Sequence, residues 1–95
     1  MALVKISPAA LGDLERLADF LRESDPLAAE RTVPLIFQAL RVLEEHPLIG
    51  RPVNVREREL LIFRGRTGYL AQYSFDFGRN EVVVLSVRHQ REVEG

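Results

Sequence analysis

Three nitrogen-rich side chains, those of Arg88, His89 and Arg91, follow an apolar run near the end of the sequence. Arginine carries a planar, permanently charged fork that suits a carboxylate or a phosphate group. Histidine titrates near neutral pH, so it can exchange a proton there. A rigid strand that delivers such groups to the rim of a sheet is a suitable place for a functional site. We take the end of this run as the first candidate site.

Two further arginines, Arg64 and Arg66, lie in a short stretch with two glycines between two predicted strands. Each candidate also has a purely structural interpretation. Charged residues in a hairpin loop are usually just solvated, and Arg88 and His89 could be a hydrogen-bonded or ion-paired strand end. Arg91 could simply begin a terminal tail. Composition alone does not decide between these interpretations.

The apolar run itself predicts an inner strand of a sheet. It consists of Val82, Val83, Val84 and Leu85. Because four successive positions are apolar, both faces of an extended segment would be covered, as in an inner strand with a packed layer on at least one side. Three of the four residues are β-branched, which favours a strand over a helix.

Two helices are predicted before this strand. A short strand over Leu3–Ile6 ends at Ser7-Pro8, an N-cap with proline at the first helical position, and the helix should reach about Ser24. Its expected buried face carries Leu11, Leu14, Ala18 and Leu21, with Leu17 beside them. Asp25-Pro26 repeats the start signal for a helix to about Glu45, in which we expect a bend at Pro34. That helix should bury Val33, Ile36, Phe37, Leu40 and Leu43.

The two helices should pack as an antiparallel hairpin, because few residues join them. A connector over residues 46–52 is predicted to have no regular element. His46, at its start, could be a ligand or a base, but a histidine at the last turn of a helix more often interacts with the helix dipole.

The remaining chain alternates with a period of two. A strand over Leu60–Phe63 precedes one that places Tyr69, Ala71, Tyr73, Phe75 and Phe77 on one face. On such a face Tyr73 is more simply a core residue than a base-stacking aromatic. A turn at 78–80 leads into the apolar run. The fold class is α+β, a helical hairpin on a mainly antiparallel sheet in the order β-α-α-β-β-β. The predicted core contains Leu14, Phe37, Leu40, Tyr73, Phe75, Val83 and Leu85.

The composition, with 46% hydrophobic and 28% charged residues, is that of a globular protein, and we expect one domain over residues 1–95. No apolar run is long enough for a membrane span, so a cytoplasmic protein is expected. With no cysteine and two histidines, no disulfide or metal site is expected. Residues 46–95 carry eight Arg against six Asp or Glu, a bias too weak for a dedicated nucleic-acid binder.

Three short motifs occur in the order of these elements: His-Pro-Leu-Ile-Gly-Arg-Pro at 46–52, Gly-Tyr-Leu-Ala-Gln-Tyr at 68–73 and Val-Leu-Ser-Val-Arg-His-Gln-Arg-Glu at 84–92. Together with the element order, they resemble the ParE/RelE superfamily, the toxins of bacterial type II toxin–antitoxin (plasmid stabilisation) modules. The resemblance covers nearly the whole chain. It implies a growth-inhibiting toxin without a cofactor, in a hetero-oligomer with a cognate antitoxin. The antitoxin would dock an amphipathic segment across the helical hairpin or an open sheet edge.

The superfamily divides by mechanism, so the resemblance leaves two functions open. RelE-like members are ribosome-dependent endoribonucleases that cut mRNA, whereas ParE-like members lack this activity and are described as inhibitors of DNA gyrase. A nuclease would use His89, Arg88 and Arg64 in catalysis, with Glu57 or Glu59 as a base. A binding toxin would contact its target through Arg64, Arg66, Arg88, His89 and Arg91.

The C-terminal residues favour the ParE branch. RelE-like toxins usually carry a tyrosine or a further histidine near the C-terminal end, where this chain has Gln90 and Arg91. Active-site lysines common in RelE-like toxins are also missing, since the only lysine is Lys5. We therefore expect a toxin that poisons DNA gyrase by binding, with ribosome-dependent mRNA cleavage as the alternative and a degenerate, non-toxic family member as a third alternative.

Overall fold

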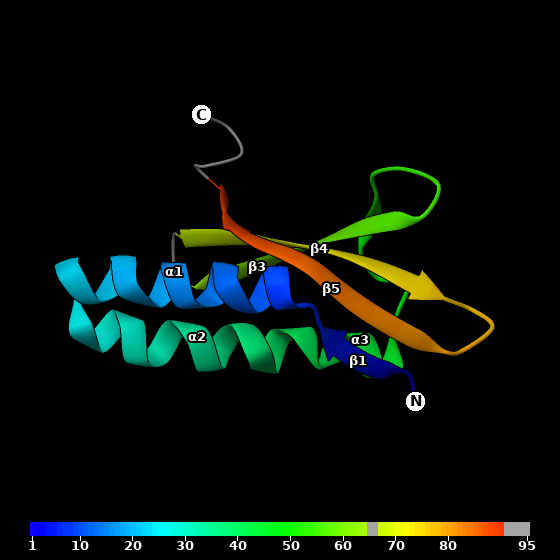
Figure 1. Ribbon diagram of the computed structural model, residues 1–95, viewed down its shortest axis with the longest axis horizontal. Helices are drawn as coiled ribbons and strands as arrows, with labels where there is room; N and C mark the ends of the chain where they lie inside the picture. The colour runs from blue at the N-terminus through cyan, green and yellow to red at the C-terminus, as the bar shows by residue number, and fades with distance from the viewer. Residues whose placement is uncertain (65–66, 91–95) are drawn as a thin grey trace.

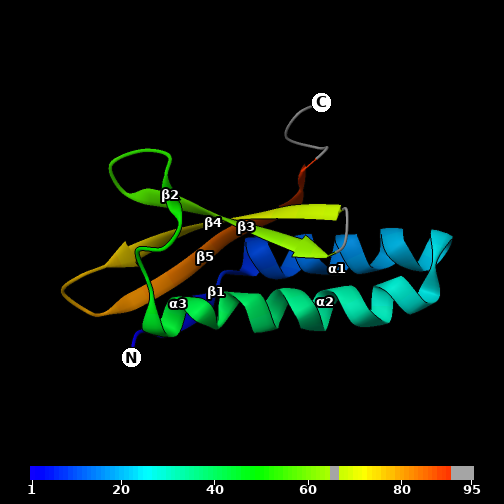
Figure 2. The same ribbon diagram turned by 180° about the vertical axis from the view of Figure 1, so that it is seen from behind.

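The computed structural model describes residues 1–64 and 67–90 (Figures 1 and 2). Its elements are, in order, β1 (Leu3–Ile6), α1 (Pro8–Ser24), α2 (Pro26–Leu40), α3 (Val42–Glu45), β2 (Arg51–Pro52), β3 (Glu57–Arg64), β4 (Thr67–Asp76) and β5 (Glu81–His89). The predicted order of elements is confirmed, with the short α3 and the two-residue β2 in addition. No helix in the described ranges is long and apolar enough to cross a membrane.

The five strands form one sheet in the order β1-β5-β4-β3-β2, and α1 and α2 lie side by side along one face of it (Figures 1 and 2). Neighbouring strands are antiparallel except for β1 and β5, which are parallel. β5 has a strand on both sides, which confirms that it is an inner strand. The face of the sheet that points away from α1 and α2 is called the open face below.

α1 begins where the sequence predicts, because Ser7 caps it. Ser7 Oγ accepts a hydrogen bond from the backbone N–H of Ala10 at 3.1 Å, and Pro8 is the first helical residue. The buried residues of α1 are Ala10, Leu14 and Leu17. Leu11, which we expected among them, is 44% exposed. That expectation is wrong because α1 turns a different stripe of its surface toward the sheet, one that begins at Ala10.

α2 also begins at its predicted cap. Asp25 Oδ1 accepts a hydrogen bond from a backbone N–H of the first turn at 3.2 Å, and the helix runs through Pro34. The predicted continuous helix to Glu45 is interrupted at Arg41, which separates α2 from α3. The N–H of Arg41 is shared among carbonyls three and four residues back, the tightening that is common where a helix ends.

Phe37 does not belong to the core, contrary to our prediction. Ile36 is fully buried, whereas Phe37 is 39% exposed. The buried residues of α2 are Ala29, Thr32, Ile36 and Leu40, spaced by three or four positions. Phe37 lies about 100° further round the helix and leaves this stripe. Val33, which was also expected in the core, is half-buried. The apolar arc of α2 is therefore wider than the arc that the sheet covers.

The core side of β4 follows the predicted alternation. Tyr69, Ala71 and Tyr73 are buried, and Phe75 packs against the same cluster while remaining partly accessible. Phe77 lies beyond the end of β4 and is 74% exposed. The predicted face is thus confirmed through its first four members and wrong for the last, because the strand ends before it.

β5 is packed under the helices on one face, which agrees with the predicted packed layer on at least one side of the strand. Its buried residues are Val82, Val84 and Val87. Val83 and Leu85, which we placed in the core, are only half-buried because they lie on the face without helices or at the bulge described next. A run of four apolar residues gave no alternation from which the buried pair could be chosen.

A β-bulge changes the alternation of β5 in the middle of the strand. Tyr73 of β4 pairs with Val84, but the preceding Gln72 pairs with Ser86, so Leu85 has no partner in β4. The extra residue shifts the phase of the strand by one position. Val87 therefore points to the helices in place of Ser86.

Tyr73 and Arg58 hold the connector between α3 and β3 against the sheet. The backbone N–H of Gly50 donates to the Tyr73 hydroxyl at 2.9 Å, and Arg58 Nη1 donates to the carbonyls of Leu48 and Gly50 at 3.0 and 2.9 Å. A Cβ on Gly50 would lie 2.7 Å from the Tyr73 ring, so glycine is required for this close approach. The last two connector residues pair with β3 as β2, which corrects the expectation of no regular element there.

Burial raises the pKa of Tyr73 above 10.0, although the hydrogen bond from Gly50 and the charge of Arg58 act in the opposite direction. The Tyr73 hydroxyl therefore stays protonated to higher pH in the folded protein than in the unfolded chain. The associated stability is complete below pH 10 and is lost as pH rises through the raised pKa. We expect Tyr73→Phe to abolish this alkaline loss and to cost about 1–2 kcal/mol at neutral pH, since Gly50 loses its acceptor.

Urea unfolding of both proteins at neutral and alkaline pH measures the two effects. The difference in free energy of unfolding between wild type and Tyr73→Phe should shrink above the unfolded pKa of tyrosine. A difference that stays constant over the whole alkaline range would show that the Tyr73 hydroxyl does not titrate differently in the two states.

Candidate functional site

Arg88 lies on the open face near the end of β5. It is exposed, and its neighbour in β4 is Leu70. Successive residues of a strand point to opposite faces, and Val87 is buried under the helices. The Arg88 side chain therefore points away from the helices, where a partner molecule can reach it.

His89 points to the other face of the same strand. Its ring meets the ring of Tyr69 edge to face, with centroids 5.4 Å apart and planes at 80°. Tyr69 is 1% exposed and His89 is half-buried. The structure therefore separates two residues, Arg88 and His89, that the sequence analysis had combined in one catalytic set.

The two candidate bases lie on β3 and already have polar partners. Glu57 Oε1 accepts hydrogen bonds from Asn54 Nδ2 at 2.9 Å and from Gln72 Nε2 at 2.8 Å. Glu59 Oε1 lies 3.0 Å from Arg51 Nη2 in a salt bridge. These carboxylates connect neighbouring segments of the sheet. In this arrangement one oxygen of each carboxylate accepts hydrogen bonds from, or pairs with, a side chain of the protein itself.

A hollow of about 540 Å³ is present on the sheet near the end of β5. Its lining combines apolar residues with the Arg51–Glu59 salt bridge: Ile49, Gly50, Arg51, Glu59, Leu60, Leu61, Leu70 and Gln90. The Gln90 side chain lies against Gly68, where any side chain would collide with it. Sequence reasoning missed Arg51 and Gln90 as lining residues. Only the pairing of β2 with β3 and of β4 with β5 brings them to one hollow.

The other predicted site residues are only partly placed. Arg64 is the last residue of β3, where its backbone pairs with Thr67. Arg66 and Arg91 lie outside the described residues. His46 is the C-cap of α3, and its N–H donates to the carbonyl of Val42 at 2.9 Å. In the described ranges, no group of three or more His, Asp or Glu side chains could hold a metal ion.

A second surface feature lies between the two long helices. This hairpin groove has a volume of about 380 Å³ and is lined by Leu11, Leu14, Glu15, Ala18, Asp19, Arg22, Val33 and Phe37. Leu11 and Phe37, which the sequence analysis had placed on the buried faces of the helices, are exposed and line this groove. Apolar residues outside the buried stripe of an amphipathic helix are the signal that could have identified this groove.

Comparison with known families identifies the group of proteins to which the chain belongs. Residues 4–94 match the model described as the ParE toxin of type II toxin-antitoxin system, parDE. The chain belongs to this family. It is the toxin component of a type II toxin–antitoxin system, and its fold, a helical hairpin on an open and mostly antiparallel sheet, is the fold of this group.

Proteins similar to this toxin in sequence or in fold carry names from both branches of the superfamily. It is 34% identical to toxin RelE3 of Caulobacter vibrioides over 92 residues, which cover 97% of this chain and 98% of that protein. The toxin of a chromosomal ParDE system from P. aeruginosa has the same fold, with a TM-score of 0.77 at 19% identity and coverage of 94% and 96%. A RelBE2 toxin–antitoxin complex from Mycobacterium tuberculosis matches with a TM-score of 0.57 at 26% identity, over 94% of this chain and 98% of the other.

Proposed function

We propose that this toxin is ParE-like: it poisons a cellular target by binding it, and a cognate antitoxin neutralises it. DNA gyrase is the target that the ParE branch implies. The observation that carries the proposal is the separation of Arg88 and His89 on opposite faces of β5. Acid–base cleavage of RNA would need a proton-transferring group and a cation to meet at one phosphate.

The occupied carboxylates of β3 support the same conclusion. Glu57 and Glu59 are held by Gln72, Asn54 and Arg51, so neither is poised to take a proton from a substrate. Arg88, in contrast, presents a permanent charge on the open face. Such a residue suits contact with an acidic protein surface, and its contribution should weaken as salt concentration rises.

The second candidate function is that of a RelE-like, ribosome-dependent endoribonuclease. Two observations favour it: the relative named RelE3 aligns along almost the whole chain, and a hollow with an arginine in its lining is present on the sheet near Arg88. The two functions differ in what accumulates when the toxin is induced without its antitoxin. A nuclease produces cut messenger RNA, whereas a gyrase poison produces broken DNA and an SOS response.

We expect His89→Gln to retain growth inhibition and Arg88→Ala to require about tenfold more toxin for the same inhibition, as the loss of one charged contact implies. Glutamine keeps hydrogen-bonding capacity at similar reach but cannot act as an acid or base near pH 7. The measurement is growth against toxin expression level, with transcript ends and DNA breaks mapped in the same cultures.

Arg79→Ala is the matched control, because Arg79 is an exposed arginine in the turn at the opposite end of β5. It should leave growth inhibition unchanged. If His89→Gln removes specific messenger RNA cuts and lowers cleavage by about 10²–10⁴-fold, the nuclease function is correct and the binding function is wrong.

We further propose that the antitoxin docks an amphipathic helix into the hairpin groove. The match to a RelBE2 toxin–antitoxin complex supports an antitoxin partner for this chain. The groove exposes Leu11 and Phe37, which fit the apolar face of a helix. Glu15 also lines it, whereas Asp19 is paired with Arg22 of the same lining, so a basic residue is expected opposite Glu15 beside the apolar positions of the antitoxin helix.

A further inference from the structure

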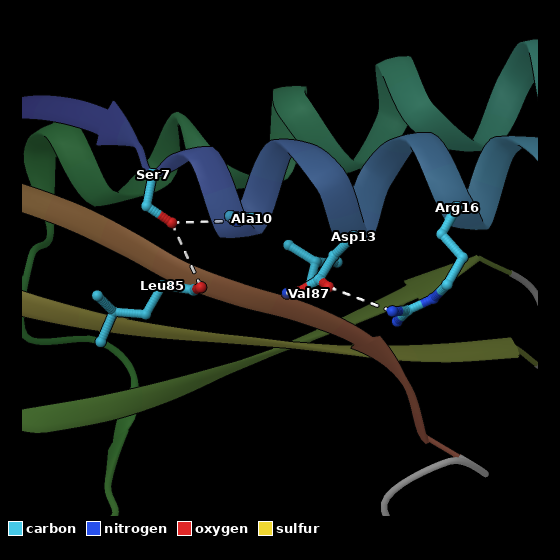
Figure 3. A network of polar contacts seen from close by, with 6 residues as sticks. All are labelled: Ser7, Ala10, Asp13, Arg16, Leu85 and Val87. Atoms are coloured by element: carbon cyan, nitrogen blue, oxygen red, sulfur yellow. Dashed lines mark hydrogen bonds and ion pairs between the residues drawn. The ribbon is translucent and has the colours of Figure 1, made fainter.

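On the side of β5 that faces away from β4, the neighbouring strand β1 covers only the first part of β5. The parallel pairing with β1 ends at Ile6 and Val84, whereas β5 continues to His89. Beyond this point α1 lies along β5 (Figure 3). Backbone groups at a strand edge that is covered by a helix still need hydrogen-bond partners.

Ser7, the N-cap of α1, and Asp13 of α1 supply partners, as Figure 3 shows. Ser7 Oγ donates to the carbonyl of Leu85 at 3.3 Å. Asp13 Oδ2 accepts from the N–H of Val87 at 3.0 Å, while its Oδ1 lies 3.5 Å from Arg16 Nη1. One contact thus lies at the bulge residue itself, and the other lies two residues after it.

The phase after the bulge decides which side chains reach the open face. If β5 continued the alternation set by Val82 and Val84, Ser86 and Arg88 would point toward the helices. The bulge at Leu85 instead sends Arg88 to the open face. A contact that fixes the strand just after the bulge therefore acts together with the pairing of Arg88 and Leu70 to hold Arg88 in this direction.

We propose that Asp13 is a positioning residue that fixes the end of β5 and thereby holds Arg88 on the open face. The inference rests on the proposed function in one respect, namely that Arg88 contacts the target. The Asp13 side chain is 18% exposed, so water competes little for its hydrogen bond. Val87 is 1% exposed, and its N–H would be left without an acceptor if Asp13 were truncated.

Amide hydrogen exchange of the 95-residue chain tests the positioning directly. In Asp13→Ala we expect the Val87 amide to exchange about five- to tenfold faster, which corresponds to one lost hydrogen bond of about 1 kcal/mol. The His89 ring signals should also shift, because the ring leaves its fixed place against Tyr69. Growth inhibition should then require about three- to tenfold more toxin.

Two variants separate positioning from general loss of stability. Asp13→Asn keeps an acceptor oxygen at the same reach and should restore slow Val87 exchange and growth inhibition. Glu44→Ala is the matched control, because Glu44 forms a similar i,i+3 ion pair with Arg41, at 3.7 Å and with 27% exposure, but lies on α3. It should leave both measurements unchanged.

Unchanged Val87 exchange in Asp13→Ala would overturn the inference, and so would uniformly faster exchange throughout the sheet. A second result would also overturn it: Asp13→Ala shows faster Val87 exchange and full growth inhibition, while Arg88→Ala is inactive. Arg88 would then act without being fixed by Asp13. If Arg88→Ala itself inhibits growth normally, the proposed function fails instead. In that case the exchange and ring signals still decide whether Asp13 positions β5.

Discussion

Replacing Ile36 with alanine is expected to lower the free energy of unfolding by about 2–5 kcal/mol, the range for truncating a buried aliphatic side chain. Ile36 is 0% exposed and belongs to the same buried cluster as Leu40 and Tyr73. The change removes its contacts with this cluster and leaves a cavity that close-packed neighbours fill only in part. The midpoint of urea unfolding measures the loss, provided that the m-value is unchanged.

Phe37→Ala is the matched comparison, one position along the same helix. Although phenylalanine is larger than isoleucine, Phe37 is 39% exposed, so its truncation should cost only about 1–2 kcal/mol. A cost for Phe37→Ala that equals or exceeds the cost for Ile36→Ala would show that α2 turns Phe37 toward the core.

The first residues of the two long helices could be predicted because their signals are local. Ser7 and Asp25 each cap a helix whose first residue is proline, and both caps form the hydrogen bonds that their types imply. The interruption at Arg41 has no such signal. Leu43 of α3 is fully buried, and the position of this interruption depends on how Leu43 packs in the core. Such packing is determined only by the folded structure.

The buried faces were harder to predict than the elements. Leu11 and Phe37 are apolar and fit the spacing of an amphipathic helix, yet they lie in the hairpin groove. A sequence pattern shows that a residue is apolar, but not whether the chain itself or a partner covers it. In β5 the choice of Val82 and Val84 over Val83 and Leu85 likewise depended on a bulge that the sequence does not announce.

The sequence analysis named residues of the candidate site, but it did not predict the directions or the partners of their side chains. The strand end that carries Arg88 and His89 lies where the sequence indicated. That the two side chains point to opposite faces follows from the period of two alone, and this signal was available in the sequence. The partners of Glu57 and Glu59 could not be read from the sequence, because strand pairing brings Gln72 and Arg51 beside them.

The hairpin groove and Arg88 lie on different sides of the molecule. The groove is lined by residues of α1 and α2 alone, whereas Arg88 is on the face of the sheet that points away from these helices. An antitoxin helix in the groove would therefore be recognised independently of the target contact. A change in the groove can then alter antitoxin binding without altering toxicity.

Phe37→Ala is accordingly expected to weaken antitoxin binding by about 30-fold or more, which is the effect of truncating an aromatic hot-spot residue by about 2 kcal/mol. Toxicity without antitoxin should persist, because the variant stays folded and Arg88 is untouched. Titration of the toxin with the antitoxin encoded beside it measures the affinity, and growth under co-expression measures neutralisation. Phe77→Ala is the control, since Phe77 is 74% exposed but lies outside the groove. Equal affinities of both variants would show that the antitoxin docks elsewhere, for example along a sheet edge.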